Sequence, residues 1–399
     1  MLPVRRFGRT ELPMPVLSLG GMRFQQSWSD LPADRISAES QANLRATLEA
    51  AVSAGFRHVE TARHYGSSER QLGWLLPQVP DPGRILQTKV PPQADPAVFE
   101  AELATSFERL GVARVDLLTL HGLNLPEHLE QSLRPGGCRD VLRRWQAEGR
   151  IGHVGFSTHA PLPLICEAIA SDSFDYVNLH WYFIFQDNRP ALELARAHDL
   201  GVFVISPTDK GGHLHTPSAR LRALCAPLHP IVFNDLFCLS APGIHTISVG
   251  AARPGDLVLH LDAVRLLPRA AELLPPIVAR LEQARLDALG PDWLGSWQQG
   301  LPAWQDTPGE LNLPALLLSR AIQAVSAAWL TRVAGLSFVT YFERDQDWGD
   351  GGIQNVVQQH YDLGRREGAL RHFLAVAFNR VVQPLREKDR QLPPRPPKA

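Results

Sequence analysis

The sequence is poor in cysteine, with four among 399 residues, and no two of them form a CxxC pair. Metal ribbons and cysteine-ligated iron–sulfur clusters need closely spaced thiolates, and small disulfide-stapled domains need a higher density of cysteine. The scarcity argues against a disulfide scaffold, a zinc ribbon and an iron–sulfur cluster. It is typical of proteins in a reducing compartment, so we expect a cytoplasmic location.

An excess of charge of either sign is also missing, because 40 basic side chains are balanced by 41 acidic ones and the net charge is −1. Proteins that bind nucleic acid by bulk electrostatics carry a strong positive charge. We therefore expect no nucleic-acid partner, although the balance leaves room for a local phosphate site.

Long uninterrupted apolar runs are absent as well. The most membrane-like stretch, residues 313–342, is broken by Arg320 and Arg332, with eleven residues between them. A helix needs roughly 20 apolar residues to cross a bilayer. The N-terminal segment has basic residues but lacks the apolar stretch of a secretory signal. We predict no membrane partner, and the sequence leaves the oligomeric state open.

What the chain does contain is a regular alternation of short apolar runs with helix-like segments such as residues 42–54, 96–110, 139–148 and 162–170. Such apolar strands with helices between them are typical of a parallel sheet covered by helices. The predicted strands lie near residues 16–19, 58–61, 85–90, 115–120, 151–156, 176–180, 202–205 and 246–249.

Eight strand–helix units in about 265 residues predict an α/β fold, the (β/α)8 TIM barrel. An open doubly wound sheet is the alternative. That fold is expected to carry a GxGxxG fingerprint after its first strand, and the residues there, Ser18-Leu-Gly-Gly-Met22, do not have it.

The pattern changes after about residue 268, where the strand-like runs stop. Residues 269–289, 314–334 and 366–390 are predicted to be helices, and the Pro-rich tail LPPRPPKA to be extended. We therefore predict two parts: a barrel over residues 1–265 and a helical C-terminal region over residues 266–399, whose role the sequence leaves open.

Four polar residues lie at the predicted carboxyl ends of three successive strands, where barrel enzymes carry their chemistry. Glu60 and Tyr65 follow the second strand, Lys89 ends the third and His121 follows the fourth. A phenol can donate a proton near neutral pH, and an ammonium beside it lowers its pKa. A carboxylate would hold the ammonium in place, and an imidazole can hydrogen-bond a carbonyl oxygen. The set predicts general-acid catalysis on a carbonyl; because no side chain supplies a hydride, it implies a nicotinamide.

These residues resemble the aldo/keto reductase superfamily. The resemblance covers about residues 4–265, and five further segments match in chain order: 6–12, 19–22, 151–157, 206–212 and 249–254. It implies an NADPH-dependent reductase, with NADH left possible, that acts on a small aldehyde or ketone. It also implies that Tyr65 is the proton donor, that Lys89 tunes it and that His121 orients the carbonyl.

The same resemblance assigns a cofactor site in three places. Ser157, Thr158 and Asn178 would face the nicotinamide carboxamide. Gly250 and Arg253 would bind the adenosine phosphates, and Ser206 belongs to the loop after the seventh strand.

Four positions depart from the family pattern. Glu60 replaces an aspartate, which moves the charge by roughly 1.5 Å. Thr158 replaces an asparagine, Asn178 replaces a glutamine, and Ile205 stands where an aromatic residue is frequent. Glu60, Ile205 and the unusual C-terminal region support an alternative function: a nicotinamide-binding regulatory or scaffold protein with weak or no turnover. The β subunits of voltage-gated potassium channels show such a role within the family.

Two fainter patterns remain. His213-Leu-His215 is an HxH pair of the kind that ligates zinc in barrel hydrolases, although a chance occurrence in a glycine-rich loop explains it better. Residues 307–314 resemble the sequence that follows the cysteine cluster of a C-terminal ferredoxin-type segment. Residues 293–304 before them contain no cysteine, so we expect no iron–sulfur cluster.

Overall fold

The computed structural model describes residues 2–208, 213–289 and 291. The chain divides into two compact units, one formed by residues 1–215 with 227–275 and the other by residues 216–226 with 276–399. The division predicted at residue 265 differs from this one and stays a prediction. The predicted helices at 314–334 and 366–390, the extended tail and the ferredoxin-like segment lie outside the described residues.

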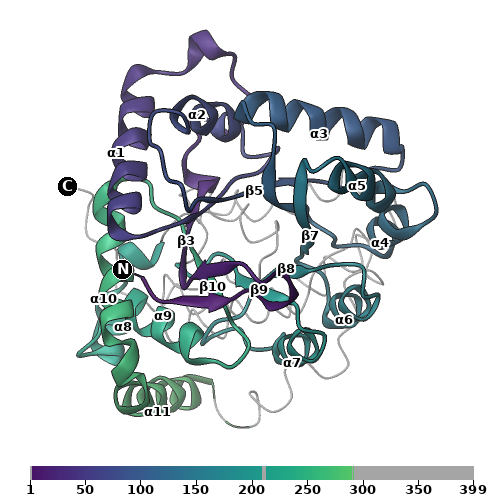
Figure 1. Ribbon diagram of the computed structural model, residues 1–399. Coiled ribbons are helices and arrows are strands. Elements are labelled where there is room, and N and C mark those ends of the chain that lie inside the picture. Colours follow the sequence, from purple (N-terminus) through teal and green to yellow (C-terminus); the bar gives the residue numbers. More distant parts are fainter. Residues whose placement is uncertain (1, 209–212, 290, 292–399) are drawn as a thin grey trace, which may run out of the picture. The chain divides into compact units, whose positions relative to one another are not determined.

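Eight parallel strands in the first unit close into a barrel (Figure 1). In order around the barrel they are β10 (Thr246–Val249), β3 (Leu17–Gly20), β4 (His58–Glu60), β5 (Ile85–Val90), β6 (Val115–Leu120), β7 (Ile151–Ser157), β8 (Tyr176–Leu179) and β9 (Gly201–Val204). The predicted (β/α)8 fold is confirmed. Because every neighbouring pair is parallel, the carboxyl ends of all eight strands meet at one mouth.

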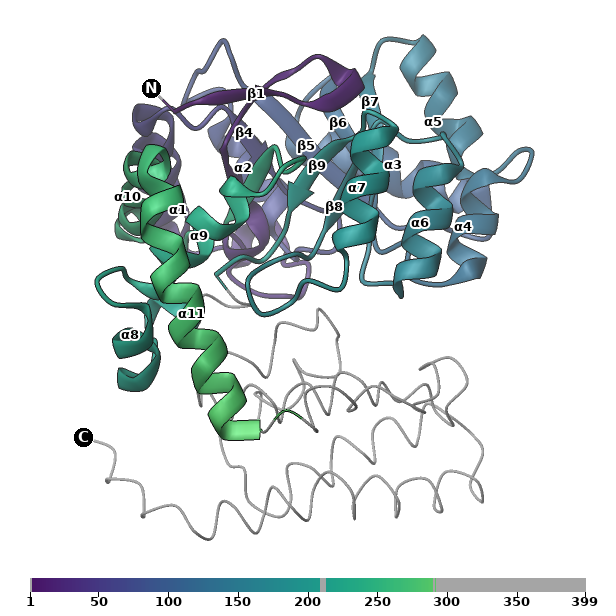
Figure 2. The same ribbon diagram turned by 90° about the horizontal axis from the view of Figure 1, so that it is seen from below.

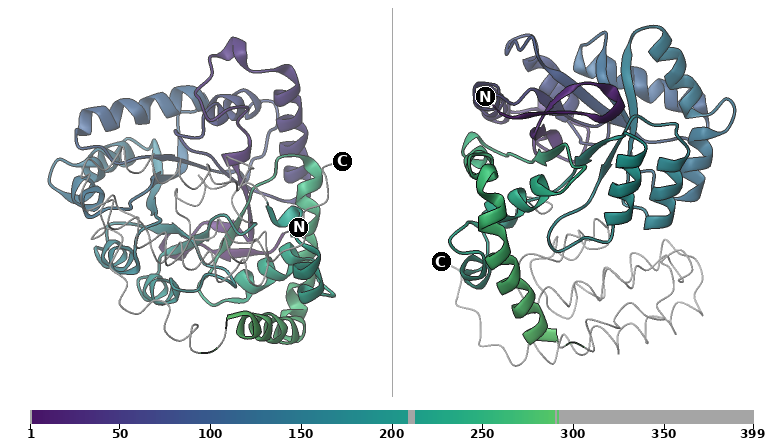
Figure 3. Two further views of the ribbon diagram at one scale, coloured as in Figure 1. Left: turned by 180° about the vertical axis from the view of Figure 1, so that it is seen from behind. Right: turned by 60° about the horizontal axis from the view of Figure 1, so that its bottom comes forward.

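Helices of the first unit surround the barrel strands (Figure 3). They are α1 (Ala38–Ala54), α2 (Ser68–Leu75), α3 (Pro96–Leu110), α4 (Pro126–Leu133), α5 (Cys138–Ala147), α6 (Leu162–Ala170), α7 (Arg189–Ala197), α9 (Pro230–Ser240) and α10 (Val258–Leu266). Local signals fix their ends. In α3, for example, the Asp95 side chain accepts from the amide of Ala97, and Gly111 ends the helix with a φ of 64°, a left-handed conformation that glycine adopts without strain.

Two further helices involve the second unit. Helix α8 (Ala219–Cys225) belongs to it, and α11 (Ala270–Leu289) begins in the first unit and continues into the second. Within the second unit, Arg280 Nε donates to the carbonyl oxygen of Leu224 at 3.0 Å. Among the described residues no single helix is long and apolar enough to cross a membrane, and only α8 and α9 taken together meet that criterion.

A hairpin of β1 (Val4–Arg6) and β2 (Pro13–Pro15) covers the amino-terminal end of the barrel (Figure 2). Its side chains Phe7 and Met14 pack against Tyr176 and Phe203, and all four are fully buried. Gly201 makes this packing possible, because a Cβ there would lie 2.7 Å from the Phe7 ring. The hairpin thus fills this end of the barrel with apolar side chains.

A glycine inside the barrel gives a direct test of this packing. A Cβ on Gly155 would lie 2.5 Å from the carbonyl oxygen of Tyr176. Because the obstacle is backbone, we expect Gly155→Ala to lower the free energy of unfolding by about 1–3 kcal/mol. Gly255 faces open space, so Gly255→Ala is the matched control and should change stability by no more than about 0.5 kcal/mol. Thermal denaturation followed by circular dichroism measures both; equal stability of the two variants would contradict the packing.

Candidate active site

A cavity of about 170 Å³ opens at the carboxyl-terminal mouth of the barrel. It is lined by Gly20, Met22, Arg23, Glu60, Tyr65, Lys89, His121, Ser157, His159, Ile205, Ser206, Thr208, Ser248 and Gly250. All four residues predicted to be catalytic line this cavity. Of the six predicted cofactor residues, three do so.

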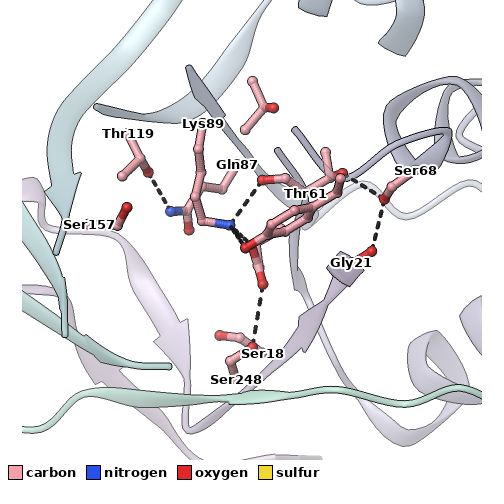
Figure 4. Close-up of polar contacts among 12 residues, drawn as sticks. Ser18, Gly21, Thr61, Ser68, Gln87, Lys89, Thr119, Ser157 and Ser248 are labelled. Atoms are coloured by element: carbon pink, nitrogen blue, oxygen red, sulfur yellow. Dashed lines mark hydrogen bonds and ion pairs between the residues drawn. The ribbon is translucent and has the colours of Figure 1, made fainter. Parts of the chain in front are cut away.

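Lys89 lies at the centre of the catalytic group and is only 1% exposed. Its ammonium donates to the Glu60 carboxylate, to the carbonyl oxygen of Thr61 at 3.0 Å and to the Tyr65 hydroxyl at 3.4 Å (Figure 4). An ammonium has three N–H donors, and these three acceptors use them all. The Tyr65 oxygen therefore accepts from Lys89, which leaves the phenolic proton to be donated elsewhere.

Burial dominates the electrostatics of this group. It lowers the pKa of Lys89 well below its ordinary range, and the Glu60 carboxylate opposes that shift. Burial also raises the pKa of Tyr65 above its ordinary value of 10, so the phenol is protonated at neutral pH. We expected the ammonium to make Tyr65 a stronger acid. The pKa of Tyr65 is instead raised, and burial is the cause.

Glu60 is held in place from β10, which is separated from its own strand β4 by β3. Ser248 Oγ lies 3.4 Å from Glu60 Oε1, where it donates a hydrogen bond. A Cβ on Gly20 would lie 2.4 Å from Ser248 Oγ and 3.1 Å from Glu60 Oε1. Gly20 thus provides the room in which the longer acidic side chain reaches Lys89. Sequence reasoning assigned no catalytic-site role to Gly20 or Ser248, because they come from strands distant in the chain.

Two aromatic side chains pack against the Tyr65 ring. The Tyr65 and His121 rings meet edge to face, with centroids 5.6 Å apart. Trp28, which is 56% exposed, packs edge to face with Tyr65 at 6.5 Å. An imidazole and a phenol in contact with each other thus both line the cavity.

The residues predicted to face the nicotinamide carboxamide lie in different environments. Ser157 lines the cavity, and its hydroxyl accepts from the amide of Gly122 at 3.0 Å. Thr158 does not line the cavity, because its hydroxyl donates to the carbonyl oxygen of Leu123 at 2.8 Å and orders the loop after β7. Asn178 is fully buried, and neither atom of its side-chain amide has a hydrogen-bond partner among the described residues.

Of the two residues predicted to bind phosphate, one lines the cavity and the other does not. Gly250 lines the cavity, whereas Arg253 does not; its side chain is 76% exposed and pairs with Asp256 at 3.2 Å. An arginine that does line the cavity is Arg23, whose Nη1 donates to the carbonyl oxygen of Gly250 at 3.0 Å. Sequence reasoning missed Arg23, although a basic residue just beyond the first barrel strand was a usable signal. Ser206 lines the cavity with a φ of 56°.

The HxH pair lies in a short 3-10 turn, His213–His215. Within residues 2–208 and 213–289, no group of three or more histidine, cysteine or acidic side chains lies close enough together to hold a metal ion. The zinc-hydrolase alternative gains no support from this part of the chain.

Known proteins resemble this chain in both sequence and fold. Curated relatives include a D-threo-aldose 1-dehydrogenase from a Pseudomonas species, 24% identical over 298 residues (60% of this chain, 87% of that protein). Another is the aldo-keto reductase str7 from Strobilurus tenacellus, 29% identical over 181 residues (41% of this chain, 50% of that protein).

Two solved structures share the fold. An aldo-keto reductase from Bacillus halodurans in its holo form gives a TM-score of 0.56 at 18% identity, covering 69% of this chain and 97% of that one. A thermostable aldo-keto reductase in complex with the inhibitor epalrestat gives 0.55 at 20% identity, covering 71% and 99%.

Two sequence families match the chain. A domain of unknown function, DUF697, matches residues 270–366. The aldo/keto reductase family matches residues 16–229, which is more than half of the chain. The protein therefore belongs to the aldo/keto reductase family, whose members oxidise or reduce carbonyl compounds with nicotinamide cofactors.

Proposed function

We propose that this protein is an NADPH-dependent oxidoreductase that reduces an aldehyde or ketone to an alcohol, with Tyr65 as the proton donor. The observation that carries the proposal is the saturation of the Lys89 ammonium by Glu60, Thr61 and Tyr65. It fixes the phenol oxygen beside a cation and leaves its proton available at the cavity. A small-molecule carbonyl substrate and a cytoplasmic location belong to the same proposal.

The residues around the cavity fit a nicotinamide cofactor. Arg23 and the backbone at Gly250 offer a cation and a close approach for phosphate groups. The buried, unpartnered amide of Asn178 supports a polar ligand group nearby, and Ser157 lines the adjacent wall. When bound, the nicotinamide supplies the hydride that no side chain can provide.

Each catalytic residue has a separate task in this proposal. Tyr65 donates its proton to the carbonyl oxygen, and His121 donates a hydrogen bond that orients the same oxygen. Lys89 stabilises the phenolate that remains, and Glu60 holds Lys89 in position. General-acid assistance of this kind contributes about 10²–10⁴ in rate. Because each step is reversible, the same residues serve the oxidation of an alcohol or a cyclic sugar.

A cofactor titration followed by a substrate panel tests the proposal. We expect NADPH to quench the protein's fluorescence at lower concentration than NADH does, and NADPH to be consumed with at least one aldehyde, ketone or aldose. No binding of either nucleotide would contradict the proposal. Binding without turnover across the panel would instead support the regulatory alternative, which Glu60 and Ile205, as departures from the family pattern, favour.

A further inference from the structure

Trp28 is an exposed aromatic side chain beside the proposed proton donor. It lies in the segment that connects β3 to α1 and is 56% exposed. Its ring meets the Tyr65 ring edge to face, at an interplanar angle of 86°. Trp28 is not among the side chains that line the cavity, but Tyr65 is. Trp28 therefore stands at the rim of the cavity, next to the group from which a bound carbonyl would take its proton.

Gln26 holds the start of this segment in place. Its backbone amide donates to Ser67 Oγ and to Gln71 Oε1, both at 3.3 Å, and these two acceptor side chains are fully buried. The Gln26 side chain donates to the carbonyl oxygen of Arg35 at 3.0 Å and accepts from the amide of Ser37 at 2.6 Å. The segment is thus closed on itself and attached to the first turn of α2.

The middle of the segment lies against Gly66, the residue that follows Tyr65. A Cβ on Gly66 would lie 1.9 Å from the carbonyl oxygen of Ser27 and 3.1 Å from that of Ser29. Gly66 also has a φ of 53°, which glycine adopts without strain. The backbone on both sides of Trp28 therefore packs on the loop that carries the tyrosine, so the contact between the two rings follows from the backbone.

Asp30 holds the far side of the segment. Its carboxylate pairs with the guanidinium of Arg109, in the last turn of α3, and lies 3.6 Å from Nη2 of Arg63. The two arginine side chains are only 12% and 17% exposed, so water screens these pairs less than it screens a surface pair. The backbone amide of Arg63 donates to the carbonyl oxygen of Lys89 at 2.9 Å. Asp30 thus connects the segment to the strand ends that carry the catalytic group.

A substrate that takes a proton from Tyr65 brings its substituent within reach of these rings. Tyr65 already contacts the rings of Trp28 and His121, and aromatic rings pair favourably in edge-to-face or offset arrangements. We propose that Trp28 contacts the substituent of the substrate carbonyl and gives a preference for aldehydes and ketones that carry an aromatic ring. Asp30 is the positioning residue that keeps Trp28 beside Tyr65. The inference rests on the proposed function and names its substrate class.

Four variants separate this preference from general stability. Trp28→Ala removes the exposed ring. Trp74→Ala is the matched control, because it removes a second tryptophan, 37% exposed on α2, that is not among the residues that line the cavity. Asp30→Asn keeps the size of the side chain and removes its charge, whereas Asp30→Glu retains the carboxylate.

The first arm compares phenylacetaldehyde with acetaldehyde, which lacks the phenyl ring and is otherwise the same molecule. We expect the wild type to prefer phenylacetaldehyde in kcat/KM. Trp28→Ala lowers that preference by roughly two- to tenfold, the value of one aromatic pair, and Trp74→Ala does not. Asp30→Asn lowers it in the same direction by raising KM for phenylacetaldehyde, and Asp30→Glu restores most of it. A role of Asp30 in stability alone would lower the rates with both aldehydes and leave their ratio unchanged.

The second arm measures binding without turnover. Calorimetry in the presence of NADP⁺ gives the dissociation constants of 2-phenylethanol, the expected product, and of 2-cyclohexylethanol, which has a saturated ring of similar size. Trp28→Ala weakens the binding of 2-phenylethanol by a similar factor and that of 2-cyclohexylethanol less. Equal weakening of the two alcohols would show that Trp28 provides apolar area only, and would overturn the aromatic preference.

An unchanged ratio of the two aldehydes in Trp28→Ala, in a protein that reduces acetaldehyde with NADPH, would overturn the inference and leave the proposed function standing. An effect of Trp28→Ala that Asp30→Asn does not reproduce would overturn the positioning role of Asp30. A wild type that binds 2-phenylethanol through Trp28 but reduces neither aldehyde would support the contact and contradict the proposed function.

Discussion

Tyr65→Phe lowers kcat for aldehyde reduction by about 10²- to 10⁴-fold, the usual contribution of a positioned general acid. The Tyr65 hydroxyl receives its hydrogen bond from Lys89 at 3.4 Å, so its own proton is the one available to the substrate. Phenylalanine keeps the ring that packs edge to face on His121. Steady-state kinetics together with fluorescence titration of NADPH measure the two effects separately.

We expect NADPH to bind Tyr65→Phe nearly as it binds the wild type, because the substitution removes one oxygen and no charge. Tyr176→Phe, which also removes a buried phenolic hydroxyl, is the control. Turnover by Tyr65→Phe at the wild-type rate would mean that another group, with His121 the nearest candidate, supplies the proton.

Lys89→Met has the second large effect, on stability as well as on activity. It removes the ammonium and leaves the Glu60 carboxylate, 3% exposed, without its counter-ion. Breaking a buried pair from one side costs about 3–5 kcal/mol. We expect a loss of that size in the free energy of unfolding, measured by denaturant titration, and a loss of turnover.

A second substitution shows whether the lost stability comes from the unpaired Glu60 charge or from the altered shape of the side chain at residue 89. Glu60→Gln in the Lys89→Met background removes the stranded charge, so the double variant should recover most of the stability and none of the activity. Arg6→Met breaks an exposed pair with Glu11 and Asp199 and should change stability far less. A double variant no more stable than Lys89→Met would show that Glu60 carries no buried charge.

The fold could be predicted because its signals are local. The predicted strands at 85–90, 115–120 and 246–249 coincide with β5, β6 and β10, since each is a short apolar run buried on both faces. Helix α3 coincides with its prediction because a capping aspartate and a terminal glycine mark its ends. Helices α2 and α4, of eight residues each, begin without a side-chain cap and were not among the predicted helices.

The catalytic group could be predicted because parallel strands bring their carboxyl ends together. Lys89 is the clearest case, since a lysine that ends an apolar strand needs a buried partner. The pKa direction of Tyr65 could not be predicted, because it depends on how much water the folded chain removes.

The remaining residues depend on contacts between distant strands. Arg23 reaches the cavity from the turn after the first barrel strand, and Ser248 reaches it from the last barrel strand. His159 stands at a strand end in the sequence, but its partner His180 is known only from the fold. Thr158, conversely, matched a family position, and its hydroxyl bonds the loop backbone instead.

The most direct test of the central claim is the fate of a labelled hydride. The protein is incubated with NADPH in which both hydrogens at C4 of the nicotinamide are deuterium and with an aldehyde identified in the substrate panel, and the alcohol is analysed by mass spectrometry and NMR. The proposed mechanism predicts one deuterium on the carbon that bears the new hydroxyl group, in proportion to the NADPH consumed. Unlabelled alcohol, or bound cofactor with no alcohol formed, would contradict it.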